Sequence, residues 1–256
     1  MTDMQRWLRR CSGPRDPGAR LICLPFAGAG AAVYADWALP ATLAAEVWAV
    51  RLPGRENRWR EEPLRELGSM VEGIAEAVSP MLDRTWVLFG HSMGALLAFE
   101  LTRRFREAGA RLPVHLFLSG AKAADLPPWR PPASNLSDEQ LLDRLAIMRG
   151  PSRSTAVDRD VLLAMAPTIR ADFATCESYA YRDAAPLDIP ITGFAAADDP
   201  EVRVDEVGEW ARHTCSRFAL YTFTGGHLFL QDDAATVLDV IAANLAADIA
   251  AVRPGR

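Results

Sequence analysis

The residues with the clearest chemical potential lie at positions 90–94, where the sequence follows the pattern G-x-S-x-G. An apolar run, residues 86–89, precedes them, and a helix-like run, residues 95–108, follows. A strand that turns sharply into a helix brings the positions two before and two after the serine so close together that only very small residues fit. The serine then stands at the tip of a strained turn, with its hydroxyl exposed. We therefore predict that Ser92 is a nucleophile; the alternative is a flexible glycine–serine turn.

A serine hydroxyl is a weak nucleophile, so it needs a base in contact with it and a carboxylate that orients the base. The chain has four histidines. His91 lies inside the turn and points away from the hydroxyl, His115 falls in a predicted buried strand, and His213 ends a predicted helix as a solvated cation. His227 remains; it lies in a loop after the last predicted strand, and two glycines immediately precede it. Because glycines let a loop fold over the sheet edge, His227 is the predicted base, with a lone surface histidine as the alternative.

The carboxylate is expected after the preceding strand, where residues 191–197 lead into Asp198 and Asp199. Either aspartate could orient the base. Asp199 precedes a proline, which holds it in extended geometry, so we favour Asp199 and assign Asp198 to a turn or cap. The order serine, acid, histidine along the chain is that of α/β-hydrolases.

An oxyanion hole needs two backbone N–H donors that point at the developing charge. In this chain order, one donor comes from Met93, the residue after the nucleophile. The other comes from the loop after the first core strand, residues 24–30, at Phe26 or Ala27, with Phe26 preferred. That glycine-rich loop lacks the G-x-G-x-x-G frame and the Walker Lys-Ser/Thr pair, which argues against a nucleotide site.

Apolar runs alternate with helical patterns along the chain, which predicts an α/β protein with a mainly parallel sheet covered on both faces. The expected strands are residues 21–24, 47–52, 86–89, 114–118, 191–196 and 218–223. The expected helices between them are residues 69–82, 95–108, 204–213 and 234–251.

Residues 125–190 interrupt this alternation. They open with a proline-rich stretch, and a capping box formed by Ser137 and Gln140 then begins a series of helical patterns over residues 139–148, 159–165 and 168–181. About sixty residues are far more than one crossover connection needs. We therefore expect a helical lid inserted into an α/β-hydrolase core formed by residues 1–124 and 191–256; the alternative is an ordinary crossover with long loops.

Composition narrows the class of protein further. The chain has 256 residues, of which 50% are hydrophobic, and a formal net charge of -5. This charge and the lack of a dense Lys/Arg block argue against nucleic-acid binding. We find neither a secretory signal nor an apolar run long enough to span a membrane. Four scattered cysteines indicate neither a zinc site nor a disulfide framework, so a cytoplasmic location without a metal is expected.

Several segments together resemble the type II thioesterases of polyketide and nonribosomal peptide biosynthesis. The Pro-Gly-Arg-Glu and Arg-Ala-Asp segments are more specific to that family than the serine motif. In the family, glycines often precede the aspartate pair, whereas residues 195–197 here are alanines, which leaves the choice of aspartate open. The matching segments are residues 24–28, 52–56, 90–94, 167–172, 177–179, 198–200 and 225–227.

The resemblance implies a stand-alone α/β-hydrolase with a helical lid. Such an enzyme removes stalled or aberrant acyl units from the phosphopantetheine arm of acyl or peptidyl carrier proteins, and carries Ser92, Asp199 and His227 as its triad. It implies no bound cofactor, since the pantetheine belongs to the substrate. Two alternatives remain: a carboxylester hydrolase or peptidase with the same triad, and a non-catalytic module that binds carrier proteins.

Two charged segments invite an interpretation. Arg55, Arg58 and Arg60 flank a tryptophan, and we weigh a solvated loop against a contact for an acidic carrier domain, which Arg149 and Arg153 would extend. For Arg170 and Asp172 we expect a structural salt bridge within the lid.

Overall fold

Seven strands form one sheet, in the order β1-β3-β2-β4-β5-β6-β7, in a computed structural model that describes residues 3–127, 132–150 and 158–252. Only β1 runs antiparallel to its neighbour, and the other neighbouring pairs are parallel. This confirms the mainly parallel sheet. The strands are β1 Leu8–Ser12, β2 Ala19–Leu24, β3 Ala45–Val50, β4 Thr85–His91, β5 Leu116–Ser119, β6 Ile191–Ala196 and β7 Phe218–Phe223.

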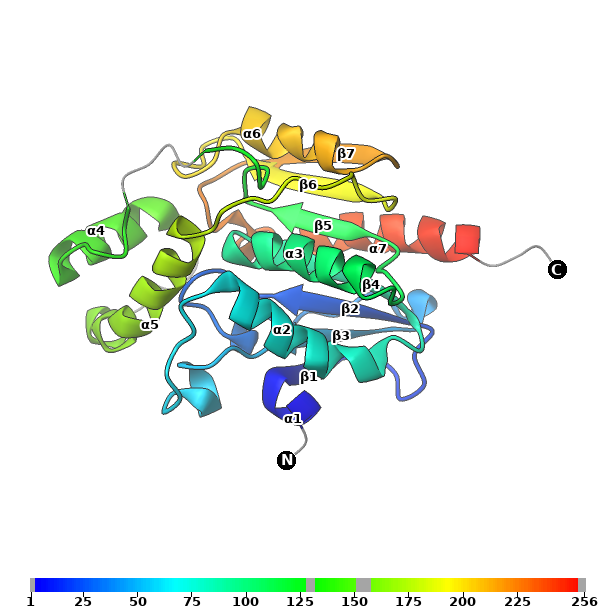
Figure 1. Cartoon of the computed structure of the whole chain (residues 1–256), viewed down its shortest axis with the longest axis horizontal. Helices are drawn as coiled ribbons and strands as arrows, with labels where there is room; N and C mark the ends of the chain where they lie inside the picture. Colours follow the sequence, from blue (N-terminus) through cyan, green and yellow to red (C-terminus); the bar gives the residue numbers. More distant parts are fainter. Residues whose placement is uncertain (1–2, 128–131, 151–157, 253–256) are drawn as a thin grey trace.

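Helices cover both faces of the sheet and one of its ends. In Figure 1, α2 and α3 lie in front of the strands and α7 lies behind them, while α4 and α5 lie beyond the end to which β2 points. None of the described helices is long and apolar enough to cross a membrane. The helices are α1 Asp3–Trp7, α2 Leu67–Val78, α3 Met93–Glu107, α4 Asp138–Arg149, α5 Arg159–Glu177, α6 Val204–Gly208 and α7 Ala234–Val252.

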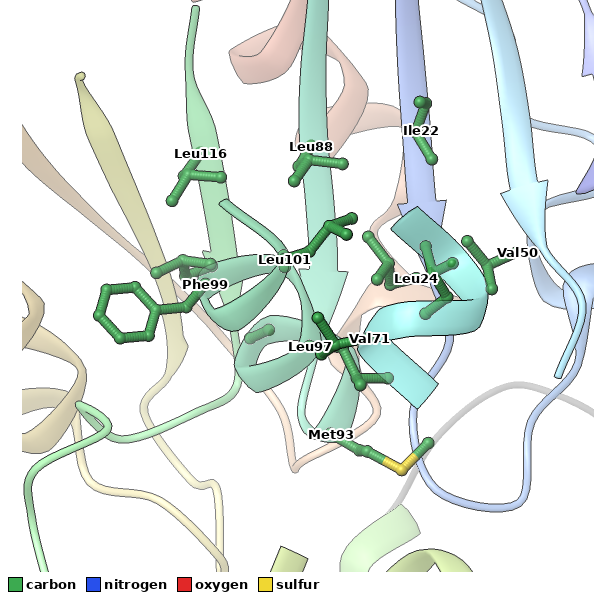
Figure 2. Packing of buried hydrophobic residues seen from close by; sticks show 14 of the residues in the cluster. Ile22, Leu24, Val50, Val71, Leu88, Met93, Leu97, Phe99, Leu101 and Leu116 are labelled. Carbon is green, nitrogen blue, oxygen red and sulfur yellow. The ribbon is translucent and has the colours of Figure 1, made fainter. Parts of the chain in front are cut away.

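Alternating strand residues supply two separate apolar cores. Ile22 and Leu24 of β2 face α2 and α3, whereas Leu21 and Cys23 face the side covered by α7. Figure 2 shows the first core, in which Leu97, Phe99 and Leu101 of α3 and Val71 of α2 lie beside side chains of four strands. Successive strand residues point to opposite faces, so burial on both sides explains why these strands are continuous apolar runs.

Most expected elements are present, but α1 was not predicted and several bounds differ. The strands at residues 191–196 and 218–223 have the predicted bounds. β1 was not predicted, because only Leu8 among its residues is fully buried and the apolar signal is weak. The two helices expected at residues 159–165 and 168–181 are one helix, α5, which continues through Pro167 and ends at Glu177. The helix expected at residues 204–213 changes to a 3-10 helix, Glu209–His213, after α6.

The segment between β5 and β6 contributes α4 and α5. The predicted capping box begins α4: Ser137 Oγ accepts from the Gln140 N–H at 3.3 Å, and Gln140 Oε1 accepts from the Ser137 N–H at 3.0 Å. A small apolar cluster around Leu141 and Ile169 joins the two helices. The boundaries of the lid at residues 125 and 190 stay a prediction.

Candidate active site

Ser92 stands between the end of β4 and the start of α3. Its backbone angles are φ 54° and ψ −118°, a conformation that non-glycine residues rarely adopt. A Cβ on Gly90 would lie 2.0 Å from the carbonyl oxygen of Gly94, and a Cβ on Gly94 would lie 2.1 Å from that of Leu24. These contacts confirm the sharp strand-to-helix turn, with glycine required for steric reasons. The Ser92 N–H donates to the Ser119 carbonyl at 2.8 Å, which ties the turn to β5.

Three side chains from distant parts of the chain form one hydrogen-bonded series. The Nε2 atom of His227 lies 2.9 Å from Ser92 Oγ, and its Nδ1 atom lies 2.9 Å from Asp199 Oδ2. The side chains of His227 and Asp199 are 2% and 1% exposed. An imidazole held in this way can take a proton from the hydroxyl while the carboxylate stabilises the resulting cation.

The path of the loop after β7 brings His227 to the serine. Gly225 has φ +99°, a conformation that favours glycine, and its carbonyl accepts from the Asp198 N–H at 3.2 Å. The His227 N–H donates to the carbonyl of Met148, near the end of α4, at 3.1 Å. The loop is therefore fixed from two sides, by the loop after β6 and by a helix of the inserted segment.

Of the two candidate acids, Asp199 contacts the imidazole and Asp198 is exposed. The second carboxylate oxygen of Asp199 accepts from the N–H groups of Glu201 at 2.7 Å and Val202 at 3.2 Å. These bonds orient the carboxylate toward the imidazole. The Ala195–Ala197 departure from the family pattern does not displace Asp199 from the histidine.

The other three histidines have partners elsewhere. His91 is buried, and its Nδ1 atom lies 2.9 Å from Ser119 Oγ; burial first, and then the neighbouring His227, lower its pKa well below the ordinary value. His115 is buried, with Nδ1 2.7 Å from Asp248. Neither ring is hydrogen-bonded to Ser92 in the described residues, as expected.

The expectation for His213 was wrong. This ring is buried rather than solvated, and its Nε2 atom lies 2.9 Å from Asp125 Oδ1. It packs against the rings of Phe99 at 5.1 Å and Trp210 at 5.3 Å. The 3-10 turn that follows α6 points the ring inward to the apolar face of α3, which helix periodicity alone did not indicate.

The loop after β2, residues 25–30, lies beside the turn that holds Ser92; we call it the oxyanion loop. The close approach of Gly94 to the Leu24 carbonyl brings the start of this loop against α3. Among the described residues, no group accepts a hydrogen bond from the N–H of Phe26, Ala27 or Met93. Ala27 and Met93 line the cavity at Ser92, and the choice between Phe26 and Ala27 stays a prediction.

A cavity of about 380 Å³ opens at Ser92 and His227. An ion pair between α4 and the loop after β6 forms part of its wall: Arg144 Nη2 lies 2.7 Å from Glu201 Oε2. Burial, together with Asp172 and Glu177, raises the pKa of the Cys176 thiol to about 12, so this lining residue stays protonated at neutral pH. Apolar lining residues include Leu96, Leu126, Met148, Phe173, Tyr179 and Val202.

The charged segments differ from what was expected. Asp172 pairs with Arg55 rather than with Arg170, and the Arg55 pair is buried, at 2.7 Å from Nη1 to Oδ2. Arg170 binds Asp138 at the start of α4 instead. On α5 both side chains leave the same helix, but the loops opposite them decide their partners.

The arginine patch is therefore smaller than predicted. Arg55 and Arg58 are buried, and Arg58 pairs with Glu61 at 2.7 Å, so neither is a solvated residue or a docking contact. Arg60 is exposed and lies over the ring of Trp59, which is itself 64% exposed. Arg149 ends α4, and Arg153 lies outside the described residues.

Comparison with known families decides the membership of the chain. The model of a family described as "Thioesterase domain" matches residues 19–245. The chain belongs to the thioesterase domain family. The match begins with β2 and extends into α7. It therefore includes the turn at Ser92, the loop after β6 that carries Asp199 (the acid loop) and the loop after β7 that carries His227 (the histidine loop). Membership supports a thioesterase-type hydrolase.

Named relatives of this thioesterase-family chain come from biosynthetic systems. The gramicidin S biosynthesis protein GrsT of Aneurinibacillus migulanus is 34% identical over 91% of this chain and 91% of its own length. Thioesterase PikA5 of Streptomyces venezuelae is 32% identical over 90% of this chain and 82% of its own. The solved structure of the type II thioesterase BorB, from the borrelidin biosynthetic cluster, superposes with a TM-score of 0.85 at 35% identity, over 93% and 97% of the two chains. These likenesses confirm the α/β-hydrolase fold.

Proposed function

We propose that this protein is a stand-alone type II thioesterase that hydrolyses acyl thioesters from the phosphopantetheine arm of carrier proteins, thereby clearing aberrant or stalled units from a polyketide or nonribosomal peptide assembly line. The observation that carries the proposal is the hydrogen-bonded series of Ser92, His227 and Asp199 at the mouth of an apolar cavity. Relatives named for gramicidin S and borrelidin biosynthesis support the substrate class.

In the acylation half, His227 Nε2 takes the proton of Ser92 as Oγ attacks the thioester carbonyl carbon. The carbon becomes tetrahedral, and its oxygen carries the negative charge. The carbon–sulfur bond then breaks, the pantetheine sulfur receives the proton from His227, and the acyl group remains on Ser92 as an ester. Asp199 holds the ring in the required tautomer and stabilises its cationic form.

In the deacylation half, His227 takes a proton from water, whose oxygen attacks the acyl-serine carbonyl. The second tetrahedral intermediate collapses, Ser92 Oγ regains the proton, and the free acid leaves. We propose that the N–H groups of Met93 and Phe26 bind the oxyanion in both halves; losing one such donor costs on the order of 10²-fold in rate. This chemistry needs no cofactor of the enzyme's own, because the pantetheine arrives with the substrate.

The cavity suits an acyl chain at the serine. Its wall is mainly apolar, and an apolar chain gains free energy when it leaves water for such a surface. Arg144, Glu201 and Lys122 add polar groups to the lining, where a polyketide-like substrate would present oxygens.

The test is hydrolysis of a panel of acyl-carrier proteins by the wild-type chain and by Ser92→Ala, with mass detection of the acyl-enzyme. We expect the wild type to release free acid and to show an acyl adduct on Ser92, and Ser92→Ala to lose activity by about 10⁴-fold or more. If kcat/KM is higher on oxygen esters or peptides than on acyl thioesters, the chain is a carboxylester hydrolase or peptidase instead. If neither protein hydrolyses any acyl substrate but both bind carrier proteins, the chain is a non-catalytic binding module.

A further inference from the structure

One buried carboxylate on α5 holds the middle of the oxyanion loop. The Oδ2 atom of Asp172 accepts from the backbone N–H of Gly28 at 2.7 Å, and this side chain has no exposed surface. Gly28 has φ +78°, and a Cβ there would lie 2.7 Å from Cγ1 of Ile169, also on α5. The helix and the loop are therefore in direct contact, and Asp172 supplies the polar link between them.

Arg55, in the loop after β3, completes the connection. Its guanidinium donates to both carboxylate oxygens of Asp172, with Nη1–Oδ2 at 2.7 Å and Nη2–Oδ1 at 2.9 Å. Nη1 also donates to the carbonyl of Ala29 at 3.1 Å, and Nε donates to that of Pro53 at 3.1 Å. One ion pair thus joins two positions of the oxyanion loop to α5 and to the loop after β3.

The chemistry of this pair indicates a purpose beyond stability. Removing two charges from water is costly, and apolar side chains of similar volume often stabilise a fold as well or better. An ion pair differs from apolar residues because its hydrogen bonds are directional and fix the backbone groups they reach. Here those groups are Gly28 N–H and Ala29 C=O, and Ala29 N–H donates in turn to the Phe26 carbonyl at 2.9 Å.

We propose that Asp172 and Arg55 are positioning residues, which hold the oxyanion loop so that its free N–H groups point at the developing negative charge. The inference rests on the proposed function. Donors of this kind stabilise a transition state only when they are preorganised to within about 0.5 Å. Neither side chain touches the substrate; each acts through the loop backbone.

The experiment compares Asp172→Asn and Arg55→Lys with Glu46→Gln. Glu46 is a matched control because it is also a buried carboxylate paired with arginines, Arg10 at 3.0 Å and Arg20 at 2.7 Å, but it lies at the amino end of β3, away from Ser92. For each variant, kcat and KM on an acyl thioester are measured, together with the affinity for an acyl trifluoromethyl ketone. That ketone forms a tetrahedral adduct with the serine, so its affinity reports the oxyanion hole.

We expect Asp172→Asn to lower kcat by roughly tenfold to hundredfold and to lower the affinity for the trifluoromethyl ketone by a similar factor, with KM unchanged. Glu46→Gln should change neither kcat nor ketone affinity, whatever it does to thermal stability. If Asp172→Asn does not fold, Arg55→Lys decides: a lysine keeps the buried charge but cannot bind two carboxylate oxygens and a carbonyl in one plane, so a smaller loss of the same kind is expected.

Folded Asp172→Asn or Arg55→Lys with wild-type kcat and ketone affinity would overturn the inference, and so would losses that Glu46→Gln matches. Failure of the proposed function looks different. In that case the wild type itself does not hydrolyse acyl-carrier thioesters, whereas the positioning role fails only if the wild type is active and the variants equal it.

Discussion

The Nε2 atom of His227 lies 2.9 Å from Ser92 Oγ, although 135 residues separate the two along the chain. In the sheet, β5 and β6 lie between the strands that carry them. The histidine loop therefore reaches across three strand intervals, about 14 Å at the usual spacing of parallel strands. Because β4 and β7 run in the same direction, both residues leave the sheet at the same edge.

The acid provides a matched pair of substitutions. Asp199→Asn should lower kcat by about 10⁴-fold, because an amide cannot hold the imidazole in the tautomer that accepts the serine proton. Asp198→Asn changes the neighbouring, exposed carboxylate in the same way and should retain the wild-type rate. Steady-state kinetics on an acyl thioester checks both. Equal losses would mean that Asp198 shares the role.

The ion pair of Arg144 and Glu201 links α4 to the acid loop, since the Glu201 N–H also binds Asp199. Arg144→Met should lower kcat/KM roughly tenfold, the factor that corresponds to about 1.4 kcal/mol. The loss arises because α4 and the acid loop are no longer held together. Arg159→Met is the control, because its pair with Glu139 is exposed on both sides. Similar kcat/KM values for the two variants would show that the ion pair of Arg144 and Glu201 does not contribute to activity.

Stability should fall as the pH drops below about 6.5. Burial is the largest cause that lowers the pKa of His91, and the charge of His227 lowers it further. Burial also lowers the pKa of His115, although Asp248 acts in the opposite direction. A lowered pKa means that the unfolded chain binds the proton more readily than the folded chain. The stabilisation is therefore complete above pH 6.5 and is lost as the pH falls toward the folded pKa.

Urea unfolding between about pH 7.5 and 5.5 measures this effect, at up to about 1.4 kcal/mol per pH unit for each histidine. Carboxylates with a lowered pKa, such as Glu61 with a pKa of about 2, affect stability only below that pH range. His91→Gln and His115→Gln should each reduce the slope. If both variants show the same pH dependence of the free energy of unfolding as the wild type, the buried histidines are not its cause.

Arg60 tests the docking of a carrier protein. It is exposed beside Trp59, in the loop after β3, at the sheet edge where Ser92 lies. Arg60→Glu should raise KM for an acyl-carrier protein and leave KM for a small free thioester unchanged, because complementary charge acts on the encounter. Arg84→Glu is the control, since Arg84 precedes β4 at the opposite edge. Equal effects on both substrates would argue against docking at Arg60.

Local patterns predicted those elements whose residues interact with near neighbours along the chain. The apolar run of β6 matches its strand because all of its residues are buried, and the capping box of α4 involves residues only three positions apart. β1 was not predicted because Leu8–Ser12 includes two arginines and a serine, so the segment lacks an apolar run. Two separate helices were expected at residues 159–165 and 168–181, yet α5 continues through Pro167, and Thr168 Oγ1 donates to the Gly54 carbonyl at 2.7 Å.

Partners of charged residues were the least predictable feature. Arg170 and Asp172 are close in sequence and suggested a local bridge, but Arg55, 117 positions away, pairs with the aspartate. His213 was expected in solvent and lies against Phe99 and Trp210. In each case the partner belongs to another element, whose position depends on the packing of the whole sheet.

The sequence by itself determined which residues can react, in what order they occur, and that glycine must stand at positions 90 and 94, because those properties depend on side-chain chemistry and on sterics within one turn. Only the tertiary structure decided that Asp199 rather than Asp198 meets His227, and that Asp172 reaches the oxyanion loop. Hydrogen bonds close to 3 Å long between such distant residues depend on strand order and loop paths, which arise from long-range packing and leave no local pattern in the sequence.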